Sequence, residues 1–320
     1  MFALSVWTEV RPGFGEDAHP LVAFHRAGGE GVLAVFDGSG GAGAAPAWEA
    51  PDGDTRSGAW VGSRVARLAV ESWFHRAVTR RDGDSPDALR DDLGDLLALA
   101  PSQHSKITGT MRRSLPTTLA GLRFWTASGE IRWQALWAGD SRAYVLSPRF
   151  GLQAVTRDHT EETDTLELLR SDPPMTNVIS RDRPFHIETQ RMTLHLPCVL
   201  LAATDGFFGY VHTPADFELL LLDTLSRAGD MAGWATELHR LVSDYSGDDA
   251  SLSLVALGYA DFEQLRHAFM PRGETLTAWL RRGGRPSVEG DAMRRWQDRT
   301  WAEYRGDYER LLRSTKEGSA

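Results

Sequence analysis

The sequence contains very little cysteine and lysine. Its 320 residues include one cysteine, Cys198, so no disulfide framework is possible. Cys198 lies in the apolar run LPCVLLAATDG, where a free cysteine is usually a small buried hydrophobic residue and not a nucleophile. The two lysines are Lys106 and Lys316, and neither ends a Gly-rich loop. ATP hydrolysis through a P-loop is therefore excluded.

Long apolar runs and a targeting segment are also absent. No run approaches the ~18 apolar residues of a membrane span, and the N-terminal MFALSVWTEVR has no basic start and is interrupted by Glu9. The formal net charge is −9, so the chain as a whole does not attract nucleic acid or an anionic membrane. We therefore expect a cytoplasmic protein that binds neither.

The composition, with 42% hydrophobic and 25% charged residues, is that of a globular protein. Short apolar runs that end in Gly, Asp or Pro indicate strands, and segments with helical spacing stand between them. Strands in runs and helices in pairs favour a layered α+β fold over repeated βαβ units. The predicted strands span 2–10, 21–27, 31–36, 117–127, 130–138, 142–147, 186–196, 198–204 and 251–260, and the predicted helices span 58–78, 86–100, 214–229 and 231–245.

After about Ala260 the sequence has helical spacing and no strand signal, which predicts a helical C-terminal extension over 261–320. Six residues of this extension recur every three or four positions and would line one face of a helix. That face either packs on the protein's own surface, the interpretation we favour, or docks a partner. The six residues are Met293, Trp296, Thr300, Tyr304, Tyr308 and Leu311.

Carboxylates recur at the ends of the predicted strands. Side chains at strand ends lie on the rim of a sheet, so neighbouring strands would bring them together. Like charges at short range repel and raise one another's pKa, and divalent cations relieve this repulsion. Ligation by oxygen alone favours Mg²⁺ or Mn²⁺ over zinc. These carboxylates are Glu16, Asp17, Asp37, Asp140, Asp205 and Asp248.

Seven short motifs, which include most of these carboxylates, point to one protein family. VFDGSGG, LPTTLAGL, WAGDSRAYVL, TRDHT, NVISR, LAATDGF and GDDASLSLVAL, in this order, resemble the metal-dependent Ser/Thr protein phosphatases, the protein phosphatase 2C family, in its bacterial form. The likeness runs from about Glu9 to Gly258. It implies a four-layer sandwich, in which helices flank two antiparallel sheets, and a catalytic domain over 1–260 followed by the extension.

The resemblance also implies roles for the acidic residues. Asp37 would bridge two Mg²⁺ or Mn²⁺ ions, with the Gly38 carbonyl as a further ligand. Asp205 and Asp248 would hold one ion, and Glu16 would face the other. Hydrolysis would then proceed through water activated by the dinuclear centre, without a covalent enzyme intermediate.

Two further acidic residues have implied roles outside this dinuclear centre. In bacterial members the position of Asp140 helps to hold a third, weaker ion, and Asp17 would orient metal-bound waters. The expected cofactors are therefore two Mg²⁺ or Mn²⁺ ions with a third, weaker one.

Three positions depart from the family pattern. Ser39 stands where animal members have a His proposed as general acid, although many bacterial relatives also lack it. Pro12 stands where the phosphate-binding Arg is usual; Arg11, one position earlier, takes that role if the loop bulges and is otherwise a solvated loop charge. Gly209 replaces an Asp that some relatives use to hold a water.

The resemblance implies an enzyme that hydrolyses phosphoserine and phosphothreonine in proteins, as part of signalling. Its expected partner is a phosphoprotein, either a cognate Ser/Thr kinase or the targets of that kinase. The alternative is a phosphatase-fold pseudoenzyme that binds a phosphoprotein or another partner without turnover. The three departures favour the pseudoenzyme, whereas the intact carboxylate set argues against it.

Other motifs point to weaker alternatives. GSGGAG (38–43) has the spacing of a dinucleotide fingerprint, but two prolines follow where a helix should begin. GDSRA resembles a serine-hydrolase elbow, but strand residues follow Ser141. PDGDTRSG (51–58) lacks two acidic ligands of a calcium loop. His159 lies in a family motif that we interpret as structural, and other histidines such as His186 show no metal spacing. Residues 160–177 fall where relatives carry a flap beside the active site, which we expect to tune substrate access.

Overall fold

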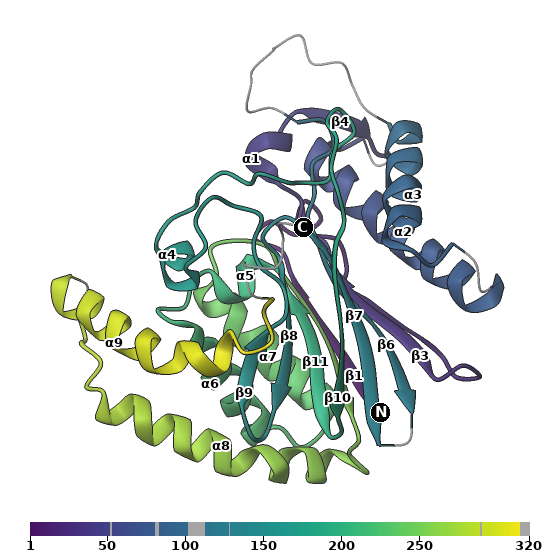
Figure 1. Ribbon diagram of the computed structural model, residues 1–320. Coiled ribbons are helices and arrows are strands. Elements are labelled where there is room, and N and C mark those ends of the chain that lie inside the picture. The colour runs from purple at the N-terminus through teal and green to yellow at the C-terminus, as the bar shows by residue number, and fades with distance from the viewer. Residues whose placement is uncertain (52, 81–82, 102–112, 128, 289, 314–320) are drawn as a thin grey trace.

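A computed structural model describes the chain except residues 52, 81–82, 102–112, 128, 289 and 314–320. Its strands are β1 (Phe2–Thr8), β2 (Leu21–His25), β3 (Glu30–Val35), β4 (Pro46–Glu49), β5 (Thr55–Ser57), β6 (Leu119–Ala127), β7 (Glu130–Ala138), β8 (Arg142–Ser147), β9 (Gly151–Ala154), β10 (Glu188–His195), β11 (Cys198–Ala203) and β12 (Ala250–Leu257). They form two five-stranded antiparallel sheets, β1-β12-β11-β8-β9 and β10-β7-β6-β3-β2, and the ribbon β4-β5 (Figure 1).

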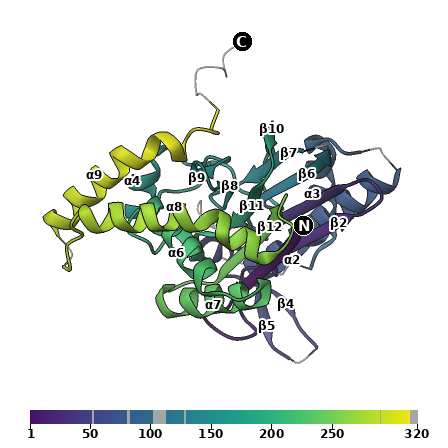
Figure 2. The same ribbon diagram turned by 90° about the horizontal axis from the view of Figure 1, so that it is seen from below.

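Helices cover the outer face of each sheet. The helices of the described residues are α1 (Gly40–Gly43), α2 (Gly58–Arg80), α3 (Pro86–Leu99), α4 (Thr165–Arg170), α5 (Asp205–Phe208), α6 (Pro214–Arg227), α7 (Met231–Tyr245), α8 (Phe262–Arg282) and α9 (Asp291–Tyr308). Helices α2 and α3 pack on the sheet that contains β3, and α6, α7, α8 and α9 share a core with the sheet that contains β12 (Figures 1 and 2). The predicted α+β four-layer sandwich is confirmed.

Strands such as β3 and β11 are buried on both faces, which explains why they read as nearly continuous apolar runs. In β3, Leu33 and Val35 point into the core between the sheets, whereas Val32 and Ala34 point toward α2 and α3. Alternate residues of a strand face opposite sides, so each strand contributes to two cores. Cys198 lies in the core between the sheets, where burial raises the pKa of its thiol to about 12. The prediction that it is a small buried residue is confirmed.

All nine predicted strands and the four predicted helices are present, with ends that differ by a few residues. The first strand ends at Thr8 and not at residue 10, because the Glu9 carboxylate turns to accept the N–H groups of Gly13 and Gly15. Strands β4, β5 and β9 escaped prediction, since three or four residues are too few to show a period. Strand β5 lies in the weak calcium-loop motif, and β8 begins after Ser141 as expected.

The C-terminal extension folds as α8 and α9, which lie side by side on the outside of the molecule (Figures 1 and 2). The six residues of its predicted face are all at least 90% buried, so packing on the protein's own surface is confirmed for that face. Glu218 of α6 is fully buried, accepts two hydrogen bonds from Arg272 of α8 at 2.6 and 2.9 Å, and accepts a third from Tyr304 of α9. The division of the chain at residue 260 stays a prediction.

No helix among the described residues is both long and apolar enough to cross a membrane. Two residues that entered the sequence arguments, Lys106 and Lys316, lie outside the described part of the chain.

Candidate metal centre

The predicted metal ligands follow strand ends that lie at one end of the sandwich. The last residues of β3 and β7 pair with the beginning of β6, and the last residues of β11 pair with the beginning of β12. Residues 139–141 join β7 to β8, whose first residue pairs with the last residue of β11, so the chain leaves β3, β7 and β11, and enters β12, at the same end. The carboxylates placed there are Asp37, Asp140, Asp205 and Asp248.

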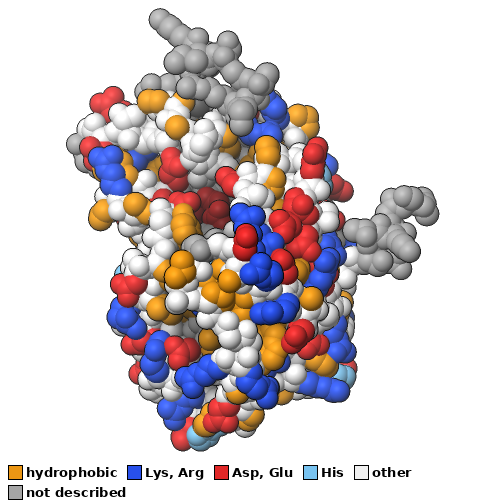
Figure 3. Space-filling model, turned by 90° about the vertical axis from the view of Figure 1, so that its left-hand side faces the viewer, with side chains coloured by type: hydrophobic (Ala, Val, Ile, Leu, Met, Phe, Trp, Pro, Cys, Tyr) orange, Lys and Arg blue, Asp and Glu red, His pale blue; other side chains and the backbone are white. Residues whose placement is uncertain are grey.

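Three of these carboxylates line one cavity. Asp140, Asp205 and Asp248 contribute to a cavity of about 350 Å³, and residues 168–173 form its other wall. Figure 3 shows acidic side chains at the bottom of a hollow on this face of the molecule. The fold thus brings together residues that are more than 100 positions apart in the sequence.

The backbone of Asp37 is held by two threonines that immediately precede β6. Its N–H donates to Thr118 Oγ1 at 3.2 Å, and its carbonyl accepts from Thr117 Oγ1 at 2.7 Å and from the Thr118 N–H at 2.8 Å. Gly38 comes next, and a Cβ there would lie 2.5 Å from the carbonyl oxygen of Glu16. Glycine is therefore required for the backbone of the DG turn to lie against Glu16.

Glu16 approaches the cluster from the loop after β1. Its carboxylate accepts a short hydrogen bond from Ser57 Oγ, and a Cβ on Gly40 would overlap one of its oxygens. Its backbone N–H donates to Asp249 Oδ2 at 2.6 Å. Sequence reasoning missed this role of Asp249, although the residue is adjacent to Asp248 in the motif GDDAS.

Asp17 lies behind the cluster, with 2% of its surface exposed. Its Oδ2 accepts a hydrogen bond from Thr204 Oγ1 at 2.9 Å, and Thr204 is the residue before Asp205. Burial, together with the charge of Asp205, raises the pKa of Asp17 to about 8. Asp17 is therefore positioned through Thr204, next to the proposed ligand Asp205.

The carboxylates raise one another's pKa. Burial and the charge of Asp205 raise the pKa values of Asp37 and Asp140 well above the ordinary range. Burial and Asp248 raise the pKa of Asp205 to about 6. Burial is also the main reason why the pKa values of Glu16 and Asp248 are raised. Without a cation, the cluster therefore favours the protonated acids.

The donor set fits a hard divalent cation. Every predicted ligand supplies oxygen, which is the donor that Mg²⁺ and Mn²⁺ prefer. Asp140 Oδ1 is buried and has no hydrogen-bond partner among the described residues, so a cation would satisfy an otherwise costly buried oxygen. The pKa values are raised mainly by burial and then by neighbouring carboxylates, and a bound divalent cation would offset both effects by favouring the ionised acids.

The turn that carries Asp140 is stabilised by contacts of the two residues that follow it, Ser141 and Arg142. Arg142 forms a bidentate ion pair with Asp158, at 2.8 and 2.7 Å, and its guanidinium lies 4.3 Å from the centroid of the Phe208 ring. Ser141 Oγ lies 2.6 Å from Thr118 Oγ1, which also holds Asp37. The Asp37 and Asp140 turns are therefore joined through hydroxyl groups.

A second cavity, of about 490 Å³, lies on the Glu16 side of the cluster. Arg11 and Arg56 both line it, and their guanidinium carbons lie 3.6 and 4.4 Å from the centroid of the Phe14 ring. Arg56 is 8% exposed, is paired with Asp54 at 3.4 Å, and precedes Ser57, the partner of Glu16. The structure thus places Arg11 beside Glu16 and adds Arg56, which sequence reasoning missed.

Ser39 is half-buried at the beginning of α1. Its N–H donates to the Pro116 carbonyl at 3.3 Å, and its carbonyl accepts from the Gly43 N–H at 2.9 Å. These contacts are made by backbone atoms, so they do not explain why a serine side chain occupies this position. A helix of four residues, α1, forms within GSGGAG, where the sequence predicted none, and β4 begins at Pro46.

Two histidines and a glutamate meet near the Asp140 turn. Ligand atoms of His159, His186 and Glu188 lie within 4.8 Å of one another, which the sequence spacing of the histidines did not suggest. His159 Nδ1 accepts the Gly139 N–H at 3.1 Å, so Nε2 carries the proton of the neutral ring and donates to Glu188 at 2.9 Å. His159 therefore has no free lone pair for a metal, and the cluster holds the Gly139 turn in place.

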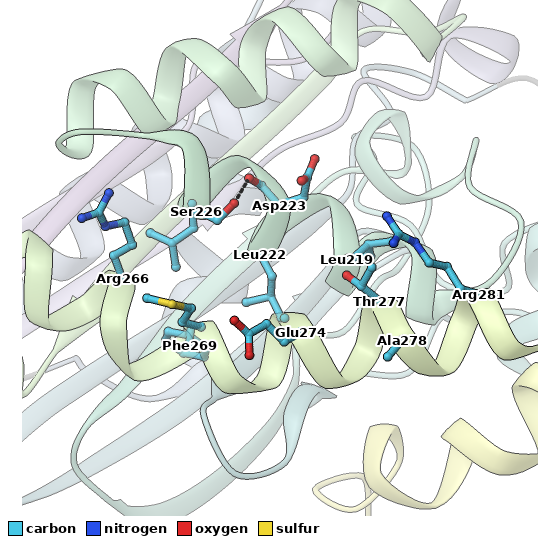
Figure 4. A pocket seen from close by; sticks show the side chains of 13 residues that line it. Leu219, Leu222, Asp223, Ser226, Arg266, Phe269, Glu274, Thr277, Ala278 and Arg281 are labelled. Atoms are coloured by element: carbon cyan, nitrogen blue, oxygen red, sulfur yellow. Dashed lines mark hydrogen bonds between the residues drawn. The ribbon is translucent and has the colours of Figure 1, made fainter.

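A groove of about 610 Å³ lies elsewhere, between α6 and α8 (Figure 4). Leu222 and Phe269 form part of its lining, with Asp223, Glu274 and Arg281 among its charged residues. None of the predicted metal ligands lines this groove. The candidate site therefore stays with the carboxylate cluster.

Comparison with known proteins finds matches in structure but not in sequence. No protein-family model and no curated protein matches the sequence. A bacterial serine phosphatase matches with a TM-score of 0.57 and 19% identity over 81% of this chain and 98% of its own. Stp1 from Staphylococcus aureus matches with a TM-score of 0.55 and 20% identity over 80% of this chain and 94% of its own.

A third phosphatase, PstP from Mycobacterium tuberculosis, matches with a TM-score of 0.54 and 16% identity over 81% of this chain and 99% of its own. The chain has the fold of the PPM Ser/Thr phosphatases. At the level of the fold, the resemblance seen in the sequence motifs is confirmed. At identities of 20% or less, the likeness establishes the PPM fold and leaves activity to be argued from the site.

Proposed function

We propose that this protein is a Mg²⁺- or Mn²⁺-dependent phosphatase that hydrolyses phosphoserine and phosphothreonine in proteins. The observation that carries the proposal is the convergence of five carboxylates, whose pKa values are all raised, at one end of a PPM fold. These carboxylates are Glu16, Asp37, Asp140, Asp205 and Asp248.

In this proposal two ions would be held by Asp37, the Gly38 carbonyl, Asp205, Asp248 and Glu16. A third, weaker ion would be held at Asp140. Bound divalent ions supply Lewis-acid stabilisation of phosphoryl charge and acidify water.

The protein's own residues prepare the site for a phosphoryl group. Arg11 and Arg56 line the cavity next to Glu16, and a guanidinium donates paired hydrogen bonds that suit phosphate oxygens. Thr204 orients Asp17 behind the ligands. Ser39 has a hydroxyl that does not ionise near neutral pH, so we assign the proton for the leaving alkoxide to water.

The pseudoenzyme is the second candidate function. It is supported by Ser39, Pro12 and Gly209, the three departures from the family pattern. Under this alternative the carboxylate cluster would bind metal or phosphoprotein without turnover. Metal-dependent hydrolysis separates the two functions.

The proposed substrate is a phosphoprotein, either a cognate Ser/Thr kinase or the targets of that kinase, in a cytoplasmic signalling pathway. The net charge of −9 gives no support to nucleic acid or an anionic membrane as a partner. The arginine-lined cavity provides local positive charge for an anionic group next to an otherwise acidic centre.

The decisive experiment measures phosphate release from a phosphothreonine peptide and from p-nitrophenyl phosphate, with Mn²⁺, Mg²⁺ or EDTA. We expect turnover with either ion, none in EDTA, and a loss of at least about 100-fold in Asp37→Asn and Asp205→Asn. Asp244→Asn, an exposed position on α7, is the matched control. A folded wild type that binds Mn²⁺ but hydrolyses neither substrate would favour the pseudoenzyme.

A further inference from the structure

The flap segment contributes one wall of the carboxylate cavity. Thr160 and residues 168–173 line it opposite Asp140, Asp205 and Asp248. Within this segment α4 is the regular element, and it has six residues. A helix of that length is not stable by itself in water, so contacts with the rest of the protein determine where the wall stands.

The C-terminal end of α4 is held by α9. Arg170 Nη2 donates to Asp298 Oδ1 at 2.7 Å, to Gln297 Oε1 at 3.0 Å and to the Arg294 carbonyl at 3.2 Å. Gln297 also donates through Nε2 to the His212 carbonyl at 3.1 Å, which ties the same point of α9 to the loop before α6.

The N-terminal end of α4 is held by the same helix. Asp164 caps α4 by accepting the Leu166 N–H at Oδ1, at 2.9 Å. Its other oxygen, Oδ2, accepts from Arg305 Nη1 at 2.7 Å and from Trp301 Nε1 at 3.2 Å, both on α9. The Asp164 carboxylate therefore caps the N-terminus of α4 and also connects α4 to α9.

Helix α9 is itself immobilised by the core. Trp296 and Tyr308 are 1% exposed, and Tyr304 donates a hydrogen bond to the buried Glu218 of α6. Figures 1 and 2 show α4 lying against α9. The flap is thus connected to the outer helical layer by contacts that span 124–141 residues of sequence.

We propose that α9 is a latch that positions the flap and thereby sets how tightly the site binds a phosphopeptide. The latch consists of Asp298, Gln297, Trp301 and Arg305 of α9, which hold Arg170 and Asp164 at the two ends of α4. A phosphopeptide extends beyond its phosphoryl group and must pass along the flap wall, whereas a small phosphate ester reaches only the carboxylates. This inference rests on the proposed phosphatase function and adds a positioning role for the C-terminal extension.

The test opens the latch at positions that do not line the cavity. The variant Asp298→Ala/Arg305→Ala removes one contact at each end of α4, and Arg299→Ala/Asp307→Ala, at exposed positions of the same helix, is the charge-matched control. We expect the latch variant to raise KM for a phosphothreonine peptide about 5-fold, as two weakened ion pairs allow. Its kcat/KM for p-nitrophenyl phosphate should stay within about 2-fold of wild type. Asp298→Glu alone keeps the carboxylate and should behave as wild type.

Hydrogen exchange of the α4 amides gives a readout that does not depend on turnover. We expect faster exchange at Thr165–Arg170 in the latch variant and unchanged exchange in the control. Unchanged exchange in the latch variant would overturn the latch. Faster exchange with equal losses on both substrates would overturn its role in peptide recognition. If the wild type proves inactive, the proposed function fails, and calorimetric affinity for the phosphopeptide replaces KM as the test of the latch.

Discussion

The two flanks of the carboxylate cluster are built differently. On the Glu16 side, Arg11, Phe14 and Arg56 form a cavity from the N-terminal loop and the β4-β5 ribbon, with positive charge stacked on an aromatic ring. On the Asp140 side, the wall is a flap held by the last helix of the chain. In the proposed phosphatase, the strand ends would supply the groups for chemistry, and each flank would supply a separate means of recognising the substrate.

The difference predicts separate consequences when each flank is damaged. Damage to the arginine flank should weaken every phosphate ester, because each substrate presents a phosphoryl group. Damage to the flap flank should affect peptides more than small esters. The following predictions go from the largest expected effect to the smallest.

Removing the buried anchor of the flap flank should have the largest effect, and it should be on stability. Arg272→Leu leaves Glu218 buried without its ion-pair partner, which should lower the free energy of unfolding by about 3–5 kcal/mol. Urea denaturation measures this loss. Arg227→Leu, which removes an exposed pair with Asp223, should cost less than about 1 kcal/mol. Equal losses in the two variants would refute the anchor.

Removing a guanidinium from the arginine flank should reduce catalysis on all substrates. Arg56→Gln is expected to lower kcat/KM about 10–100-fold for both the phosphopeptide and p-nitrophenyl phosphate, since a hydrogen bond to a charged group contributes about 1.5–3 kcal/mol. Arg80→Gln, an exposed position at the end of α2, is the control. A loss confined to the peptide would show that Arg56 recognises the chain around the phosphate and not the phosphoryl group.

The buried Asp17 predicts how the metal-free protein responds to pH. Its folded pKa of about 8 lies above the unfolded value of about 3.9, so between these values the folded state holds more protons than the unfolded state. Stability in EDTA should therefore fall as the pH rises, by about 2 kcal/mol from pH 6 to pH 8. Denaturation at several pH values measures this slope. The slope should shrink in Asp17→Asn, and an unchanged slope would assign it to other carboxylates.

The smallest effect is expected at Ser39, which lies between the two flanks. Ser39→Ala should change kcat by less than about 3-fold, because a hydroxyl that does not ionise near neutral pH is not the source of the leaving-group proton. A pH profile of kcat provides the measurement. A loss above 10-fold, with a shifted basic limb of the profile, would make Ser39 part of the proton path.

The sequence predicted the parts of the site that depend on strand ends. Asp37, Asp140 and Asp205 each follow a predicted strand, so their convergence could be expected before the structure was known. Arg56 could not be found in this way, because its strand β5 has three residues and no visible period. The contacts of the proposed flap latch could not be predicted from the sequence either, since Arg170 and Asp298 are 128 residues apart.

The same limit applies to the His159 cluster, in which His186 and Glu188 come from the segment before and within β10. Its members could be named individually, but their meeting depends on how β7 pairs with β10. Contacts that depend on register and on the packing of distant helices are set by the whole fold, and a single sequence does not display them.

The central claim is that the carboxylate cluster is a divalent-metal centre, and calorimetric titration of the metal-free protein with Mn²⁺ at pH 7 tests it most directly. The account predicts at least two bound ions per chain, with binding reduced in both Asp37→Asn and Asp205→Asn and retained in Asp244→Asn. A wild-type protein that binds no Mn²⁺, or that binds it equally well in all three variants, would contradict the account.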